Sequence, residues 1–187
     1  MGKWFRTIKE KSMSLRCVYG KDITPEMILE AIEIDNKVFP EKYRGKLDTC
    51  MLWLKQSPDI YTMVLDDDKV VGYINAMPTT RQVIDLLRDS FKMDATDTYP
   101  YNILSYSDPN ISALYIHSIA VHPSYQDTGT IDFLLGKFFM RLAKTLGNKA
   151  KALTFLACVI SEDGEKLCNK LGLVRVIDYG KIKVYEG

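Results

Sequence analysis

The 187-residue sequence lacks several features that would point to a particular class of protein. It has no excess of basic charge, because 25 lysines and arginines stand against 24 aspartates and glutamates, for a net charge of +1. We therefore expect no nucleic acid and no acidic membrane surface as a partner. No apolar run approaches the roughly 20 residues of a membrane-spanning helix, and the N-terminus has no sustained apolar segment of the signal-peptide kind.

Patterns for metal binding and for disulfide bonds are missing as well. The four cysteines, Cys17, Cys50, Cys158 and Cys168, lie far apart, and no C-x-x-C pair or histidine cluster with the spacing of zinc ligands occurs. We therefore expect no bound metal, reduced thiols and a cytoplasmic location.

Hydrophobic residues make up 47% of the sequence and charged residues 26%, which is typical of a globular protein, and the length is that of one domain. The periodicity alternates between apolar runs of strand length and amphipathic segments of helix length, as in an α/β fold. Strands are predicted at 15–19, 112–121 and 153–160, hairpins at 60–78 and 173–186, and helices at 24–40, 47–58, 81–91, 130–146 and 161–172.

The segment SIAVHPSYQDTGTIDFLLGKFF, residues 118–139, passes from an apolar strand through a polar turn into an amphipathic helix. A helix that begins directly after a strand presents unpaired N–H groups to an anion, and Gly129 would let that anion approach the backbone. The turn suits a pyrophosphate, although a plain strand-to-helix turn is an equal alternative from these residues alone. The GxxxxGK[ST] and GxGxxG patterns are absent, so neither a P-loop nor a dinucleotide fingerprint is indicated.

The stretch IAVHPSYQDTGTIDFLL resembles the signature of the GNAT superfamily of N-acetyltransferases, in which a strand ending in V-x-P leads to [QR]-x-x-G-x-[GA] and a leucine-rich helix. Gln126 and Gly129 match in order and spacing, and the likeness in the order of elements covers residues 15–186. It implies an α/β fold with a GNAT-like mixed, twisted β-sheet flanked by helices on both faces, in a single domain 1–187 with an insertion at 79–112. Several positions depart from the family: Ile131 replaces a Gly or Ala, and the last motif, usually N-x-x-A-x-x-x-Y-x-x-x-G-F, reads Ser161, Gly164, Cys168, Gly172 and Leu173, so its usual Tyr is missing.

The resemblance implies an N-acetyltransferase that moves an acetyl group from acetyl-CoA directly to a primary amine of a small molecule or a protein. The residues that it implies for cofactor binding are Ile119, Ala120, Val121, Gln126, Asp127, Thr128, Gly129, Thr130, Ile131 and Ser161. Two other interpretations stay open: a catalytically weak regulatory module that binds acyl-CoA, and an interaction scaffold in which Gly129 is only a turn residue.

The transfer also needs a base, and the two histidines of the chain, His117 and His122, both lie beside the loop. A neutral imidazole with a pKa near ~6.5 suits proton removal from an amine. Strict alternation would place Tyr115, His117, Ile119 and Val121 on one face toward the cleft, unless a bulge inverts the pattern. We predict His117 as the catalytic base, with a buried structural histidine as the alternative, and a structural role for His122.

Cys168 is the predicted general acid, because a thiol with a pKa near ~8.5 can donate a proton to the departing thiolate. The alternative is a small buried hydrophobe. The acceptor would lie opposite the cofactor, beside residues 79–112, where Tyr99, Tyr101 and Tyr106 could pack an apolar amine or anchor the loop. The same segment could form a subunit contact, so a homodimer is an open expectation.

Overall fold

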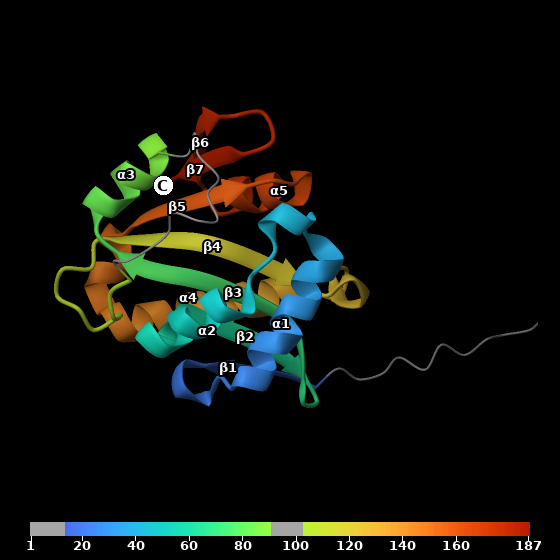
Figure 1. Ribbon diagram of the computed structural model, residues 1–187. Helices are drawn as coiled ribbons and strands as arrows, with labels where there is room; N and C mark the ends of the chain where they lie inside the picture. Colours follow the sequence, from blue (N-terminus) through green and yellow to red (C-terminus); the bar gives the residue numbers. More distant parts are fainter. Residues whose placement is uncertain (1–13, 91–102) are drawn as a thin grey trace, which may run out of the picture.

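The computed structural model describes residues 14–90 and 103–187. Seven strands form one twisted, mixed sheet in the order β1-β2-β3-β4-β5-β7-β6 (Figure 1). Neighbouring strands are antiparallel except β4 and β5, which run parallel. The strands are β1 (Leu15–Tyr19), β2 (Tyr61–Asp66), β3 (Lys69–Thr79), β4 (Ala113–Val121), β5 (Thr154–Val159), β6 (Val174–Asp178) and β7 (Lys183–Glu186).

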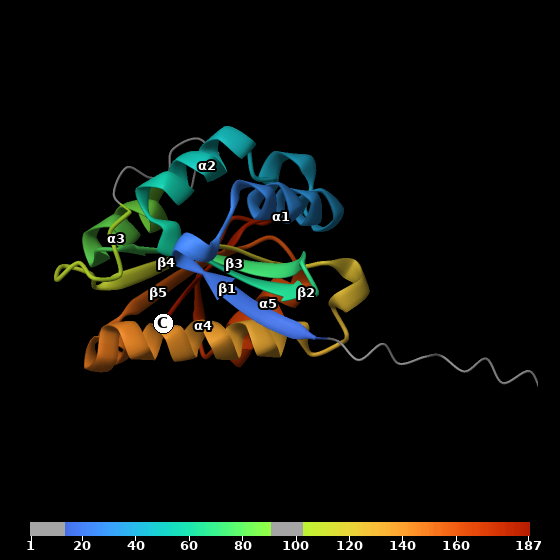
Figure 2. The ribbon, with the colours of Figure 1, turned by 90° about the horizontal axis from the view of Figure 1, so that it is seen from below.

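Helices cover both faces of this sheet, as Figure 2 shows edge-on. On one face, here called the α1 face, lie α1 (Pro25–Val38), α2 (Leu47–Gln56) and α3 (Arg81–Ser90); on the other, the α4 face, lie α4 (Thr130–Leu146) and α5 (Glu162–Lys170). Each face has its own apolar core, one centred on Ile28, Trp53 and Met63 and the other on Leu114, Leu134 and Phe138. The arrangement confirms the fold class expected from the sequence.

Local sequence signals explain where the helices begin and end. The Thr24 hydroxyl accepts a hydrogen bond from the Met27 N–H at 3.4 Å, and Pro25 opens α1, as predicted. The Ser161 hydroxyl caps α5 in the same way through the Gly164 N–H at 3.1 Å. Gly147, with a positive φ, ends α4. The predicted elements therefore match the observed ones, with ends that differ by a few residues.

One residue of β4 has no partner on β3. Asn75 pairs with Ser118 and Ala76 with Ile116, so His117 is the extra residue of a β-bulge. Beyond the bulge the alternation of side chains is inverted: Ile119 packs in the core of the α4 face, whereas Tyr115 packs in that of the α1 face. The expectation that Tyr115, His117, Ile119 and Val121 share one face is therefore wrong.

The parallel strands β4 and β5 diverge halfway along their length. Their ladder joins only residues 113–116 to residues 154–157. From the bulge onward β4 pairs with β3 alone, and beyond Ala157 β5 pairs with β7 alone. Backbone groups of β4 that point toward β5 are therefore without a strand partner in the second half of β4.

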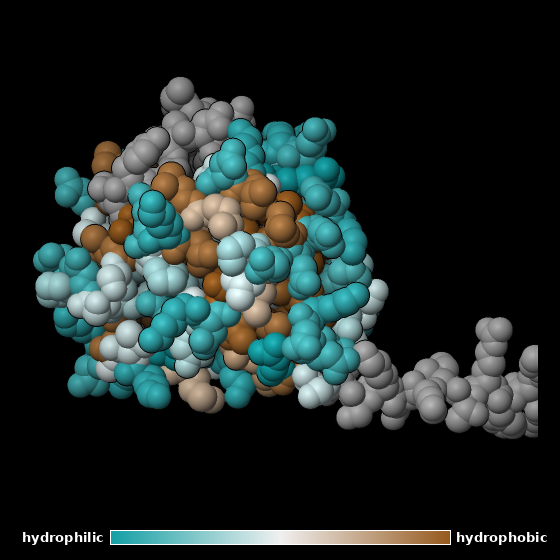
Figure 3. All heavy atoms as spheres, turned by 60° about the horizontal axis from the view of Figure 1, so that its bottom comes forward, coloured by the Kyte–Doolittle hydropathy of each residue, from teal (hydrophilic) through white to brown (hydrophobic). Residues whose placement is uncertain are grey.

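The outer surface of α1 and α2 is unusually apolar. Leu29, Leu47 and Leu52 expose 42–51% of their surface there, and Figure 3 shows apolar residues gathered over these helices among hydrophilic ones. Surfaces of this kind often contact other molecules. Within residues 14–90 and 103–187, no helix has the length and apolar character needed to cross a membrane, and no group of three or more metal-ligating side chains occurs.

Candidate functional site

A cavity of about 630 Å³ passes through the sheet where β4 and β5 diverge. On the α4 face it is lined by the turn before α4 and by α5, including Gln126, Ile131 and Lys170. On the α1 face it is lined by α1, α2 and the middle strands, including Asp35 and Trp53. One cavity therefore connects the two faces of the sheet.

Most residues that the sequence predicts for cofactor binding line this cavity. They are Ile119, Ala120, Val121, Gln126, Asp127, Ile131 and Ser161. The other three, Thr128, Gly129 and Thr130, form the turn from which α4 starts. Ser161 reaches the cavity while its hydroxyl caps α5, so its side chain already has a structural role.

The turn before α4 has the geometry of an anion site. Gly129 adopts a left-handed conformation, with a φ of 79°. The Phe133 N–H donates to the Gly129 carbonyl at 3.0 Å, so the N–H groups of the preceding first turn have no partner within the helix. The Thr130 side chain is buried and its hydroxyl lies 2.8 Å from that of Thr128, so Thr130 would offer a ligand only its backbone. A helix start of this kind can hold a phosphate.

Charged side chains from both α4 and α5 surround this opening. Lys170 of α5 forms an ion pair with Asp132 in the first turn of α4, with 2.6 Å between Nζ and Oδ1. Lys166 pairs with Asp163 within α5 at 2.8 Å. All four side chains are exposed, so these pairs contribute little stability and the lysines can turn toward an anionic ligand at small cost.

His117, at the bulge of β4, lines the cavity. Its ring packs edge-on against Trp53, with 4.8 Å between ring centroids. Its Nδ1 is buried and has no hydrogen-bond partner among the described residues. Burial lowers the pKa of His117 to about 4, so the imidazole is neutral at physiological pH. His122 lies outside the cavity, where its ring contacts the Lys37 ammonium and accepts from the Ser124 N–H, in keeping with a structural role.

A chain of hydrogen bonds runs from the cavity to a buried carboxylate. The Ser118 hydroxyl donates to the Tyr73 hydroxyl at 3.2 Å, and the Tyr73 hydroxyl donates to Asp35 Oδ1. The Gly45 N–H donates to Asp35 Oδ2 at 3.1 Å. Burial raises the pKa of Asp35 despite these bonds, and Asp35 has no ion-pair partner among the described residues.

Two further polar atoms of residues that line the cavity are buried without a hydrogen-bond partner in the described structure: Tyr43 Oη and Asn75 Oδ1. An unsatisfied buried polar group costs about 1–3 kcal/mol. Together with His117 Nδ1, they are three hydrogen-bonding atoms around one cavity whose bonds the described residues do not supply.

Comparison with known proteins identifies the fold. No model of a known protein family matches the chain, and no curated protein matches it by sequence. Solved structures do match. The Ard1 structure from Thermoplasma volcanium has a TM-score of 0.63 and 12% identity, covering 92% of this chain and 96% of that one. A protein of Desulfovibrio desulfuricans assigned to the GNAT family has a TM-score of 0.59 and 12% identity, covering 93% and 98%. The chain has the GNAT fold.

A third structure with this fold contains CoA. The NatC complex bound to Gag peptide and CoA matches with a TM-score of 0.60 and 12% identity, covering 93% of this chain and 96% of that one. At such low identity the likeness concerns the GNAT fold, and the chemistry of this chain rests on its own residues.

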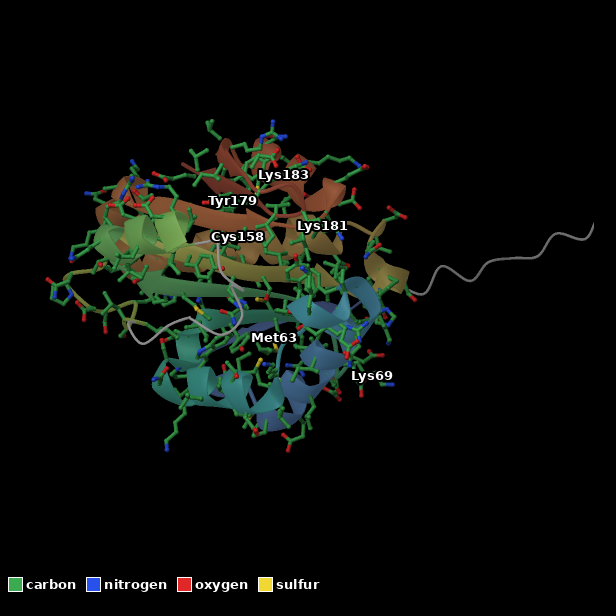
Figure 4. All side chains as sticks on the ribbon, turned by 45° about the horizontal axis from the view of Figure 1, so that its top comes forward. Met63, Lys69, Cys158, Tyr179, Lys181 and Lys183 are labelled. Carbon is green, nitrogen blue, oxygen red and sulfur yellow. The ribbon has the colours of Figure 1, made fainter. Side chains whose placement is uncertain are left out.

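Thiols and a tyrosine gather where the two strands of this GNAT fold diverge. Cys158, Cys168 and Tyr115 all line the cavity, and Tyr115 contributes a hydrogen bond that lowers the pKa of Cys158, although burial still raises that pKa to about 12. Burial and the charge of Glu165 raise the pKa of Cys168 to about 11, so its thiol stays protonated. Cys158 of β5 and Tyr179 of the β6–β7 turn, both labelled in Figure 4, pack against the core of the α1 face.

The predicted acceptor tyrosines are placed elsewhere or lie outside the described residues. The Tyr106 hydroxyl donates to the Ala76 carbonyl at 3.0 Å, and its ring packs 5.1 Å from the Arg141 guanidinium, so Tyr106 anchors its loop to the body. Tyr99 and Tyr101 belong to the residues that the structure does not describe.

Sequence reasoning missed the polar residues that line the cavity on the α1 face, above all Asp35, Tyr73 and Asn75. One signal was available for Asp35, which lies on the apolar face of α1, seven residues after Ile28 and four after Ala31. A carboxylate at a core position of an amphipathic helix calls for a buried partner.

Proposed function

We propose that this protein is an N-acetyltransferase that moves an acetyl group from acetyl-CoA to a primary amine of a small molecule or a protein by direct transfer. The observation that carries the proposal is the single cavity that joins an anion-binding turn on one face of the sheet to a polar pocket on the other. A cofactor held at the turn would extend its thioester to the gap between β4 and β5. An amine in the polar pocket would meet it there, without a covalent intermediate on the enzyme.

The turn before α4 and the gap between β4 and β5 would bind different parts of acetyl-CoA. The first-turn N–H groups of α4 would hold the pyrophosphate, assisted by Lys166 and Lys170 at the opening. Unpaired backbone groups of β4 at Ile119 and Val121 would bind the pantetheine amides and stabilise the oxyanion of the tetrahedral intermediate. The Val121 carbonyl already accepts a hydrogen bond from Gln126 Nε2 at 3.3 Å, so the N–H groups matter more than this carbonyl.

Two side chains would assist the transfer. His117 lines the cavity, and its Nδ1, which has no partner among the described residues, would accept a hydrogen bond from the amine. Cys168, which stays protonated at neutral pH, would donate the proton that the departing CoA thiolate needs. Each role is a proposal that its own variant tests.

The test begins with calorimetric titration of the protein with acetyl-CoA, beside the Gly129→Trp variant. We expect micromolar binding in the wild type and its loss in the variant, because an indole at position 129 would occupy the anion site. Release of free CoA thiol in the presence of primary amines then measures turnover. Absence of acetyl-CoA binding in the wild type would overturn the proposal, and binding without turnover on any amine would favour a regulatory acyl-CoA-binding module.

A further inference from the structure

The part of the cavity on the α1 face combines an apolar wall with a concentrated set of hydrogen-bonding groups. The wall is formed by Ile28, Ala31, Ile32, Val38, Phe39 and Trp53. The floor is a row across three paired strands, in which Tyr61 lies beside Asn75 and Asn75 beside Ser118. Asp35 closes the row from α1 through its bond to Tyr73.

The groups on this floor are mainly acceptors for a donor-rich ligand. Asn75 Oδ1 and His117 Nδ1 have no partner in the described structure, and the Ser118 oxygen can accept while its proton points to Tyr73. Asp35 is a buried carboxyl group without an ion-pair partner among the described residues. A primary ammonium has three N–H donors and one positive charge, which match these acceptors and the charge of an ionised Asp35.

We propose that this pocket binds a primary ammonium group attached to a small apolar body, and that the chain Ser118–Tyr73–Asp35 carries one of its protons to Asp35. The proposal rests on the N-acetyltransferase function argued above and names its acceptor class and its proton path. Ser118 touches the amine, whereas Tyr73 and Asp35 act through it as positioning residues.

Charge balance favours Asp35 over His117 as the final proton acceptor. A proton that passes from a bound ammonium to a carboxylate cancels two charges in a pocket with apolar walls. A proton that passes to His117 only moves the positive charge onto a ring whose burial opposes it. His117 therefore orients the amine through a hydrogen bond and stays neutral.

The protons of the reaction are accounted for. The ammonium gives one proton along the chain, in which Ser118 passes its own proton to Tyr73 and Tyr73 passes its own to Asp35. The neutral amine attacks the thioester carbonyl, the C–N bond forms and the C–S bond breaks with its electron pair on sulfur. Cys168 then gives its proton to the departing thiolate and takes up the second proton from the nitrogen, and Asp35 returns its proton to solvent. Amide, CoA thiol and one free proton result.

Several groups around Asp35 influence its ionisation. Tyr73 of β3 and Tyr61 of β2 face it from the sheet, and Cys50 faces it from α2. Arg44, just before α2, is the cation whose field lowers the pKa of Asp35, while its Nε donates to the Phe39 carbonyl. Burial raises the pKa of Tyr73 far above its usual value, so Tyr73 relays a proton without losing one permanently.

The experiment measures kcat/KM against pH with phenethylamine as the acceptor, following CoA thiol release. We expect a wild-type profile that rises with pH as Asp35 ionises. Asp35→Asn and Tyr73→Phe should each lower kcat/KM about 100-fold or more, the range of general acid–base catalysis, and should abolish that rise. His117→Gln should keep the rise and weaken turnover less.

A matched control separates a proton path from a buried hydrogen bond. Tyr185 also donates from a buried phenol to a carboxylate, Glu165 Oε2 at 3.0 Å, but lies away from the cavity. Tyr185→Phe should leave kcat/KM within about twofold and the pH profile unchanged. Calorimetric titration of each variant with acetyl-CoA shows whether the cofactor still binds.

The outcomes are distinguishable. If kcat/KM no longer rises with pH in His117→Gln but still rises in Asp35→Asn and Tyr73→Phe, then His117 is the base and the proposal is overturned. Wild-type protein that binds acetyl-CoA but leaves phenethylamine unacetylated would overturn the acceptor class proposed here. Failure to bind acetyl-CoA would instead overturn the N-acetyltransferase function on which the proposal rests.

Discussion

Replacement of Gly129 by alanine separates backbone strain from ligand contact. Gly129 has a φ of 79°, and a Cβ added to it would meet no atom within 4 Å. The free protein therefore has room for a methyl group at this position. Only the left-handed conformation opposes the change, at about 1–2 kcal/mol for a residue other than glycine.

Gly180, in the β6–β7 turn, provides a matched control. It has the same φ of 79°, and a methyl group there would likewise meet no atom within 4 Å, but Gly180 does not lie at the start of a helix. Both alanine variants should lose about the same stability, which corresponds to roughly 2–8 °C in Tm for a chain of this size. Differential scanning calorimetry measures this comparison.

Acetyl-CoA affinity should distinguish the two variants. If a pyrophosphate rests against the backbone of the turn, the methyl group at position 129 lies where the anion must approach. We expect Gly129→Ala to weaken acetyl-CoA binding at least tenfold, about 1.4 kcal/mol, and Gly180→Ala to leave it unchanged. Equal affinities in calorimetric titrations would show that Gly129 serves the turn alone, and the anion-site assignment would be wrong.

Three other variants test single contacts. His117 has a pKa of about 4 in the folded protein against ~6.5 in the unfolded chain, so the free energy of unfolding falls as the pH drops from 6.5 toward 4. Urea denaturation of His117→Gln should show a fall over the same pH range that is smaller by at most about 3 kcal/mol. Ser161→Ala removes the α5 cap and should cost ~1 kcal/mol in thermal denaturation, whereas Ser161→Asp should not. The Arg141 guanidinium donates to the carbonyls of Asp59 and Tyr61. Because a lysine cannot reach both carbonyls, Arg141→Lys should lower the free energy of unfolding, measured by urea denaturation, by about 1–3 kcal/mol. An unchanged free energy of unfolding would refute the role of these bonds.

Local signals in the sequence were sufficient for the order of the elements. The cap at Thr24, the glycine at the end of α4 and the hairpin at residues 66–69 act within a few residues of chain, so their pattern is visible without the fold. The turn at Gly129 belongs to the same class. For this reason the sheet, its helices and the strand-to-helix turn at Gly129 could be predicted.

The part of the cavity on the α1 face could not be predicted in the same way. Asp35 and Tyr73 are 38 residues apart, and their bond exists only because α1 packs across β3. Asn75 and Ser118 come together through the pairing of β3 with β4. Long-range contacts of this kind leave no local periodicity, so only the burial of a carboxylate on an amphipathic helix hinted at them.

The bulge at His117 explains why this pocket holds two consecutive polar side chains of one strand. In a regular strand His117 and Ser118 would point to opposite faces. Because His117 is the unpaired extra residue, its ring packs on Trp53 while the Ser118 hydroxyl reaches Tyr73, so both serve the α1 face. The same extra residue turns Ile119 into the core of the α4 face, at the point where β4 leaves β5. One local irregularity thus supplies the cavity with an imidazole and a hydroxyl on the α1 face and with the apolar side chain of Ile119 on the α4 face.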